Sequence, residues 1–215
     1  MDFILKVILA YLLGSVVGSL VVGRLRGGVD IRKLGSGNAG STNALRTQGL
    51  AFGIWVVIID VAKGWIAAAL LPHLAIPGVA PVSAGLAAWL PAVCGFAAII
   101  GHVFPVWHGF RGGKGVATLV GAYAGFDLVL LAPLVLSWLA VVMVSGYVGL
   151  ASIAASIAIP VYLLLRDGAR VTPQLGFALA CALLVVWTHR GNIQRMRAGT
   201  ESRARRLWLF GRDRT

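Results

Sequence analysis

Long apolar stretches alternate with short polar segments along the chain of 215 residues. Seven stretches are apolar enough to predict membrane-crossing helices, since about 20 apolar residues cross about 30 Å of hydrocarbon. They cover residues 3–23, 50–71, 83–104, 116–131, 133–147, 148–165 and 174–189. The pattern predicts an all-α integral membrane protein with about seven transmembrane helices, in which residues 1–215 form a single membrane domain.

The stretch from Val116 to Leu165 is the least divided part of this pattern, with Asp127 as its only charge. Pro133, Gly146 and Gly149 are its expected helix breaks, because Pro and Gly interrupt helices most readily. A five-span alternative applies if two of these segments are re-entrant.

Composition supports a membrane location. Hydrophobic residues make up 59% of the chain and charged residues 12%, and the mean hydropathy is +0.88. An ordinary soluble domain is about 45–50% apolar and about 25% charged. Both cysteines, Cys94 and Cys181, lie inside apolar stretches and are interpreted as small hydrophobic residues.

The charge is strongly uneven, with 19 Lys and Arg against 7 Asp and Glu and a net charge of +12. Fifteen of these 19 basic residues lie in three polar segments, the loops 24–49 and 105–115 and the tail 190–215. Loops rich in Lys and Arg stay in the cytoplasm, so we expect all three there and the N-terminus outside. In so apolar a chain the excess charge indicates contact with anionic membrane lipids, and no nucleic-acid partner is expected.

The first polar segment, residues 34–46, combines three glycines with hydroxyl and amide side chains and ends at Arg46. Successive backbone N–H groups in such a loop, followed by a helix N-terminus, suit an anion. The alternative is a plain flexible loop. The residues expected to bind phosphate here, with Ser36 beside them, are Gly35, Gly37, Asn38, Thr42, Asn43 and Arg46.

The second segment, residues 101–118, resembles a Walker A loop but lacks its first glycine and its final Ser or Thr, so nucleotide hydrolysis is not supported. What remains is Lys114 among Gly112, Gly113 and Gly115 at the start of an expected helix. A compact cation on such a loop suits a phosphate, and the alternative is a basic loop at the membrane interface. His102 is interpreted as a structural histidine.

The third segment begins where the last span ends. Asn192 and Arg195 follow His189 at helical spacing, so the three side chains can share one face. Glu201 is the only glutamate of the chain, and it is expected to lie among the residues that contact a substrate phosphate. Beyond it, residues 203–214 mix arginines with Leu207, Trp208, Leu209 and Phe210, which predicts an interfacial segment on anionic lipid.

Asp60 and Lys63 lie three residues apart inside the second span. Intramembrane charges are usually paired, so a structural ion pair is expected, and a proton or ion relay is the alternative. Such a relay supports a second hypothesis, a small transporter of a phosphorylated or anionic solute. A third is a lipid-binding scaffold without activity.

Three motifs are absent from the sequence. No histidine has an aspartate five positions later, which argues against the usual CoA-dependent glycerolipid acyltransferases. Neither an Asp-rich cluster for Mg²⁺ nor a Cys/His cluster for zinc is present, so no metal or cofactor is expected.

Together the segments Gly35–Arg46, Gly101–Thr118 and His189–Glu201 resemble the three motifs of the PlsY family, bacterial acyltransferases that use acyl phosphate. Two departures are visible: Ser41 stands where the family usually has Ala, and Arg111 where Lys is common.

The resemblance implies a seven-span enzyme of the bacterial inner membrane with its active site on the cytoplasmic face. It implies transfer of a fatty acyl group from acyl phosphate to sn-glycerol 3-phosphate, without metal, CoA or an obligate protein partner. The positions that match the family's site are Ser36, Arg46, Lys114, Ser152, His189 and Asn192.

The chemistry of such a donor is undemanding, because an acyl phosphate is a mixed anhydride with a good leaving group. Lys114, Arg46 and backbone N–H groups are expected to stabilise the leaving phosphate. His189 is either the general base for the glycerol hydroxyl or a phosphate ligand. The ligand role is favoured, because the other polar groups of these segments suit phosphate.

Overall fold

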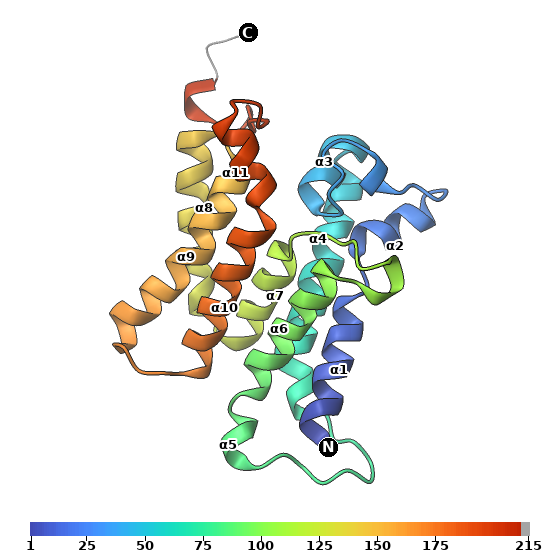
Figure 1. Ribbon diagram of the computed structural model, residues 1–215, viewed down its shortest axis with the longest axis vertical. Coiled ribbons are helices and arrows are strands. Elements are labelled where there is room, and N and C mark those ends of the chain that lie inside the picture. Colours follow the sequence, from blue (N-terminus) through green and yellow to red (C-terminus); the bar gives the residue numbers. More distant parts are fainter. Residues whose placement is uncertain (212–215) are drawn as a thin grey trace. The chain divides into compact units, whose positions relative to one another are not determined.

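The computed structural model describes residues 1–211, and every regular element in that range is helical. Arg212 and Arg214, part of the predicted lipid-binding tail, lie outside the described residues. The helices form two compact units, Met1–Asp127 and Leu128–Thr215 (Figure 1).

The first unit contains the helices up to α7 and two of the three polar segments. Its elements are α1 (Asp2–Gly14), α2 (Gly18–Leu25), the short 3₁₀ helix η1 (Ile31–Lys33), α3 (Ser41–Gln48), α4 (Leu50–Trp65), α5 (Ala84–Ala87), α6 (Leu90–Val103), the 3₁₀ turn η4 (Val106–His108) and α7 (Val116–Phe126). A π-helical turn, η2 (Ile66–Leu70), and a 3₁₀ turn, η3 (Leu71–His73), extend α4.

Small residues set the packing of this unit. Helix α1 packs on α6 and α4 packs on α7. A side chain added at Gly14 or Gly101 would collide with backbone across the α1–α6 contact, and one at Gly64 or Gly121 would do so across α4–α7. Apolar side chains gain nothing by leaving lipid for one another, so membrane helices associate through such close backbone approach.

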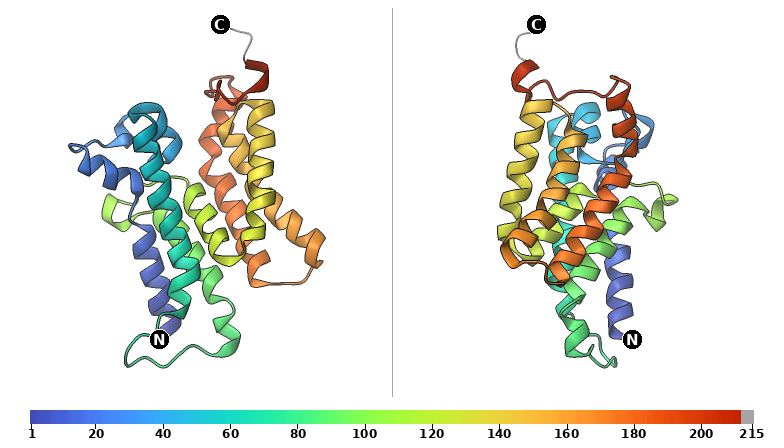
Figure 2. Two further views of the ribbon diagram at one scale, coloured as in Figure 1. Left: turned by 180° about the vertical axis from the view of Figure 1, so that it is seen from behind. Right: turned by 60° about the vertical axis from the view of Figure 1, so that its left-hand side comes forward.

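The N-terminus and the first polar segment lie at opposite ends of the first unit. Figures 1 and 2 place the N-terminus and the 74–83 segment at one end, and η1 with α3 at the other. The first polar segment therefore lies at the end of the unit that is remote from the N-terminus.

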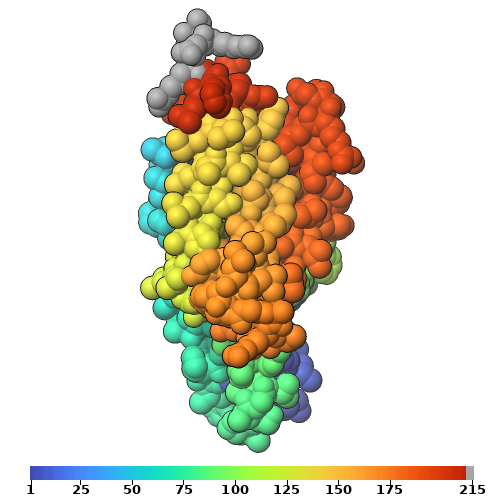
Figure 3. Space-filling model, turned by 90° about the vertical axis from the view of Figure 1, so that its left-hand side faces the viewer, coloured from blue at the N-terminus to red at the C-terminus, as the bar shows by residue number. Residues whose placement is uncertain are grey.

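The second unit holds the third polar segment. Its elements are the 3₁₀ turn η5 (Leu128–Leu130), α8 (Leu131–Ser145), α9 (Val148–Asp167), α10 (Pro173–Thr188), α11 (Arg190–Arg197) and the 3₁₀ turn η6 (Leu209–Gly211). Helix α9 packs against both α8 and α10, and Figure 3 shows α8 and α9 side by side on the surface. The α8–α9 turn, α11 and the tail share one end of this unit, and the 168–172 segment lies at the other (Figures 1 and 2).

Four helical segments of the described chain are long and apolar enough to cross a membrane: Leu50–His73, Leu90–His108, Leu128–Ser145 and Val148–Asp167. The pair α1 and α2, bent by 47°, makes a fifth if it is one span. Helices α7 and α10 are apolar but shorter. The all-helical membrane class predicted from the sequence is confirmed, and each predicted span overlaps one of these segments.

The predicted helix break at Pro133 is wrong, whereas the one predicted near Gly146 and Gly149 is present. The first break lies at Asp127, whose backbone is extended, and not at Pro133, which is the third residue of α8. A proline is tolerated in the first turn because the N–H that it lacks has no partner there. Gly149 lies inside α9, whereas Gly146, in the left-handed region, does end α8.

Candidate functional site

The first polar segment is folded around the side chain of Asn43, which is 1% exposed. Its Nδ2 shares two hydrogens among three carbonyl oxygens, those of Ile31 (3.1 Å), Leu34 (2.9 Å) and Asn38 (3.0 Å). Its Oδ1 accepts from the Ser36 backbone N–H (3.0 Å) and from Arg46 Nη2 (3.3 Å). The amide, with two hydrogens and two lone pairs, is thus engaged in holding the loop on the first turn of α3.

Several predicted phosphate-binding groups are exposed around this buried amide. Gly35 adopts a φ of +57°, and a side chain there would collide with Asn43. The loop can therefore adopt this conformation only with glycine at position 35. Gly40 precedes α3 and offers no side chain to cap it, although the first N–H groups of a helix have no partner within the helix. The exposed residues are Gly35, Ser36, Gly37, Thr42 and Arg46.

The second polar segment is anchored to α1 and α6. Tyr11 donates its hydroxyl to the Phe104 carbonyl (2.8 Å) and the Val106 N–H donates to Ser15 Oγ (3.4 Å). The Gly112 N–H donates to the Val103 carbonyl at 3.1 Å. Because of these bonds, the glycine-rich stretch folds back against the C-terminal end of α6.

His102 lies directly beneath this stretch and is 2% exposed. Its carbonyl oxygen accepts from the Gly113 N–H at 3.1 Å. A side chain on Gly113 would collide with the His102 ring, and one on Gly112 with the His102 carbonyl. The two glycines are therefore required by packing, and they place Lys114 immediately before Gly115, the N-cap residue of α7. A cation and a helix N-terminus next to each other suit an anion.

The predicted pair of Asp60 and Lys63 is a buried ion pair, with 2.8 Å between Asp60 Oδ1 and Lys63 Nζ. His102 completes it, since its Nδ1 is 2.9 Å from Lys63 Nζ. Asp60 also accepts from the Gly18 N–H (3.0 Å) and Lys63 donates to the Val16 carbonyl (2.8 Å). The pair thus holds the bend between α1 and α2 and supports the histidine beneath the second loop.

In the second unit, His189 is the buried residue that joins α10 to α11 and is 3% exposed. Its Nδ1 lies 2.8 Å from the Val185 carbonyl oxygen. A carbonyl can only accept, so Nδ1 carries a hydrogen and Nε2 is the nitrogen through which the neutral ring can accept.

Asn192 lies close to His189 in sequence, on α11, and packs against Gly149 at the start of α9. Its Nδ2 donates to Glu201 Oε1 at 2.6 Å, and Arg195 Nε donates to Glu201 Oε2 at 2.6 Å. Both oxygens of the glutamate are therefore used to orient an amide and a guanidinium. These contacts differ from the phosphate contact predicted for Glu201.

Ser152 lies one turn into α9 and is buried. Its hydroxyl donates to the Val148 carbonyl, one helical turn back, at 2.9 Å. The lone pairs of Oγ remain available as acceptors, whereas donation to a phosphate requires the hydroxyl to rotate.

Two predicted groups of site residues thus emerge, one in each unit. The first unit holds the residues of the first and second segments, and the second unit holds Ser152, His189, Asn192 and Glu201. Asp30 and Arg32, which link the first two segments, were not predicted as site residues. The available signal was an aspartate two positions before an arginine at the edge of a glycine-rich loop. The contact of His102 with Lys63 was not predicted either.

These features define a helical membrane protein with glycine-rich, basic loops suited to a phosphate-bearing substrate. A sequence model of the family described as glycerol-3-phosphate acyltransferase matches residues 4–199. The chain belongs to this family and is a glycerol-3-phosphate acyltransferase, as the sequence predicted.

Individual relatives match almost from end to end. The glycerol-3-phosphate acyltransferase of Coxiella burnetii (strain CbuG_Q212) is 38% identical over 205 residues, which cover 95% of this chain and 100% of the relative. That of Sinorhizobium medicae (strain WSM419) is 41% identical over 197 residues, covering 91% and 89%.

The fold also matches solved structures. The crystal structure of PlsY, an integral membrane glycerol 3-phosphate acyltransferase, in its glycerol 3-phosphate form has a TM-score of 0.83 at 35% identity, covering 94% of this chain and 96% of that one. Its lysophosphatidic acid form has a TM-score of 0.81 at 35% identity, covering 94% and 95%. The predicted resemblance to the PlsY family is confirmed.

Proposed function

We propose that the enzyme uses acyl phosphate as its donor and makes 1-acylglycerol 3-phosphate, a lysophosphatidic acid. The observation that carries this proposal is that the first unit has two loops suited to phosphate. Two such loops fit a reaction in which the donor and the acceptor each bear a phosphate. The solved relative is described with glycerol 3-phosphate and lysophosphatidic acid, which supports the acceptor and the product.

In the proposed reaction the C1 hydroxyl oxygen of glycerol 3-phosphate attacks the carbonyl carbon of the acyl phosphate. The bond from that carbon to the phosphate oxygen breaks, the hydroxyl proton ends on phosphate, and inorganic phosphate leaves. Lys114, Arg46, Ser36 and the N–H groups at the starts of α3 and α7 bind the phosphates and stabilise the charge that develops on the leaving group. No metal or CoA takes part.

We assign Asn43 and Glu201 as positioning residues, because their polar atoms are engaged in holding other groups. Asn43 holds the loop around Ser36 and Arg46, and Glu201 orients Asn192. In the second unit, His189, Asn192 and the Ser152 hydroxyl are the groups proposed to contact substrate.

We propose that His189 binds phosphate through Nε2. With Nδ1 donating to the Val185 carbonyl, Nε2 can donate only when the ring is protonated, and can accept a hydroxyl proton only when it is neutral. The ligand role and the general-base role therefore require opposite protonation states. In the ligand mechanism the donor's own phosphate oxygen takes the hydroxyl proton.

We further propose that α7 and α10 cross the membrane as well, giving seven spans within a single membrane domain of the bacterial inner membrane. Helix α10 has 16 residues and reaches about 24 Å, but α7 has 11 and reaches only about 16 Å. The buried Gly113 and Gly115 support the idea that the loop before α7 completes that span inside the protein. Loops 24–49 and 105–115 and the tail from residue 190 then face the cytoplasm, where the basic tail contacts anionic lipid.

The test is an assay of purified protein in detergent with palmitoyl phosphate and glycerol 3-phosphate. Phosphate release that depends on glycerol 3-phosphate, with 1-palmitoylglycerol 3-phosphate identified by mass spectrometry, is the expected result. Palmitoyl-CoA is the matched donor control. Turnover with palmitoyl-CoA at a similar rate would overturn the assignment of the donor.

A further inference from the structure

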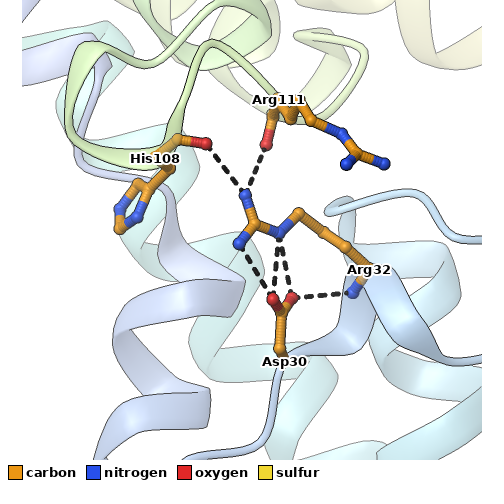
Figure 4. Close-up of polar contacts among 4 residues, drawn as sticks. All are labelled: Asp30, Arg32, His108 and Arg111. Carbon is orange, nitrogen blue, oxygen red and sulfur yellow. Dashed lines mark hydrogen bonds and ion pairs between the residues drawn. The ribbon is translucent and has the colours of Figure 1, made fainter.

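Arg32 links the two phosphate-suited loops of the first unit, although nothing in the proposed chemistry uses it. It lies in η1, between α2 and the first loop. Figure 4 shows its guanidinium between the Asp30 carboxylate on one side and the backbone of the second loop on the other.

The Asp30 side of the contact fixes the guanidinium. Arg32 Nε donates to Asp30 Oδ1 (2.9 Å) and Nη2 donates to Oδ2 (2.8 Å), while Oδ1 also accepts from the Arg32 backbone N–H (3.0 Å). Both side chains are about three-quarters buried, with 24% and 27% exposed. Such a two-point contact sets orientation as well as distance, which a lysine ammonium cannot do.

The remaining nitrogen reaches the second loop. Arg32 Nη1 donates to the carbonyl oxygens of His108 (3.0 Å) and Arg111 (3.1 Å), 76 and 79 residues further along the chain. The His108 carbonyl also accepts from the Arg111 N–H at 3.4 Å, so Arg32 binds a turn that is already closed. The Arg111 side chain points away from Arg32 in Figure 4, and Lys114 follows three residues later.

We propose that the Asp30–Arg32 pair is a positioning device for the acyltransfer reaction, which holds the Lys114 loop at a fixed place relative to the loop of Ser36 and Arg46. The pair touches backbone, so its role is to order the second loop before substrate binds. Without it, the free energy of ordering that loop is taken from substrate binding. This inference rests on the proposed function of the two loops.

The test compares Arg32→Ala, Arg32→Lys and Asp30→Asn with Arg26→Ala, which removes an exposed positive charge at the C-cap of α2. We expect Arg32→Ala to raise the KM for glycerol 3-phosphate about tenfold or more, with a smaller change in kcat. Arg32→Lys should restore little, because it keeps the charge and loses the planar fork. Arg26→Ala should match the wild type.

Asp30→Asn separates positioning from direct phosphate binding. If Arg32 were itself a phosphate ligand, releasing it from Asp30 would leave the KM unchanged or lower it. A positioning role predicts a raised KM, and a defect in the double variant Asp30→Asn/Arg32→Ala no larger than that of Arg32→Ala alone.

Hydrogen–deuterium exchange gives a readout that is independent of activity. In Arg32→Ala the amides of residues 104–115 should exchange faster while those of α4 and α6 up to Val103 keep their protection. Unchanged exchange in 104–115, an unchanged KM, or faster exchange throughout the helices would each overturn the proposal. Wild-type protein without glycerol 3-phosphate-dependent phosphate release would instead overturn the proposed function.

Discussion

Lys114, which we propose to bind phosphate, is held in place by its neighbours. The lysine is half-buried, and it follows two glycines that admit no side chain because His102 packs beneath them. The same division recurs around Asn43 and Glu201, whose own polar atoms are occupied while they hold Ser36, Arg46 and Asn192 in place. We therefore expect variants of the positioning residues to lose activity, as well as variants of the residues proposed to contact substrate.

Replacement of Lys114 is expected to remove most activity. Lys114→Ala loses the cation at the start of α7, and a loss of about 2–4 kcal/mol of transition-state stabilisation is expected if it resembles removal of one oxyanion-hole donor. Lys114→Arg should recover only part, since the longer planar head does not match a compact ammonium on a glycine-flanked loop. The measurement is kcat/KM with palmitoyl phosphate, and full activity in Lys114→Arg would contradict the packing argument.

His189 is predicted to act as a ligand, so His189→Asn should keep measurable turnover and chiefly raise the KM for a phosphate substrate. The neutral ring with Nδ1–H cannot donate from Nε2, so the ligand role requires the protonated ring. A general base would instead lose its turnover in this variant, with little change in KM. A variant with no turnover and unchanged KM values would show the ligand role to be wrong.

Asp30 should make a contribution to the free energy of unfolding that depends on pH. The Arg32 side chain, through its hydrogen bond, lowers the pKa of the Asp30 carboxyl below its ordinary value of 3.8. A carboxyl with a lowered folded-state pKa stabilises the protein above the unfolded pKa and loses this contribution as pH falls through the folded one. The wild type should therefore melt above Asp30→Asn at about pH 6, and the gap in melting temperature should narrow as the pH falls below the ordinary carboxyl pKa of 3.8. A gap that is constant with pH would contradict the ion pair.

At the scale of helices, the sequence predicted long elements well and their interruptions poorly. Apolar stretches of about 20 residues have one stable solution in lipid, so the predicted spans all found counterparts. The break at Asp127 was missed because Pro133 looked like the stronger signal, although its place in the first turn removes the cost of the missing N–H.

The candidate site was predictable to a similar degree. The glycines of the polar segments and the cations Arg46 and Lys114 marked the loops, because backbone N–H groups beside a positive charge suit an anion. The contacts of Asn43, Arg32 and Glu201 could not be predicted from the sequence. Each joins residues that are brought together by the conformation of the intervening loops.

The buried Asp60–Lys63 ion pair of α4 should stabilise the fold, because both side chains also form hydrogen bonds with backbone groups of the α1–α2 bend. Lys63→Met leaves the Asp60 carboxylate uncompensated, and a loss of about 3–5 kcal/mol in the free energy of unfolding is expected. The double variant Asp60→Asn/Lys63→Met should lose less, because no charge is left unpaired. Unfolding in detergent measures both, and an unchanged stability in Lys63→Met would contradict a structural role.

For the molecule as a whole, the proposed sidedness can be tested by cysteine labelling in intact cells and inverted vesicles. We expect Arg111→Cys and Ala198→Cys, both exposed, to be labelled only from the cytoplasmic side. Ala80→Cys and Arg170→Cys, exposed in the segments remote from the polar loops, should be labelled only from outside. The native Cys94 and Cys181 are buried, so the wild type is the background control. Labelling of Arg111→Cys from outside alone would overturn the cytoplasmic assignment.

The bend between α1 and α2 has a consequence for how the protein is made. Its backbone groups at Val16 and Gly18 are satisfied by Lys63 and Asp60, side chains that leave the ribosome more than forty residues later. A nascent chain that ends before α4 lacks these partners, and in hydrocarbon an unsatisfied peptide group is costly. We therefore expect the first two helices to adopt their native bend only after α4 has been synthesised and inserted. The bend would then form late, although its own residues are translated first.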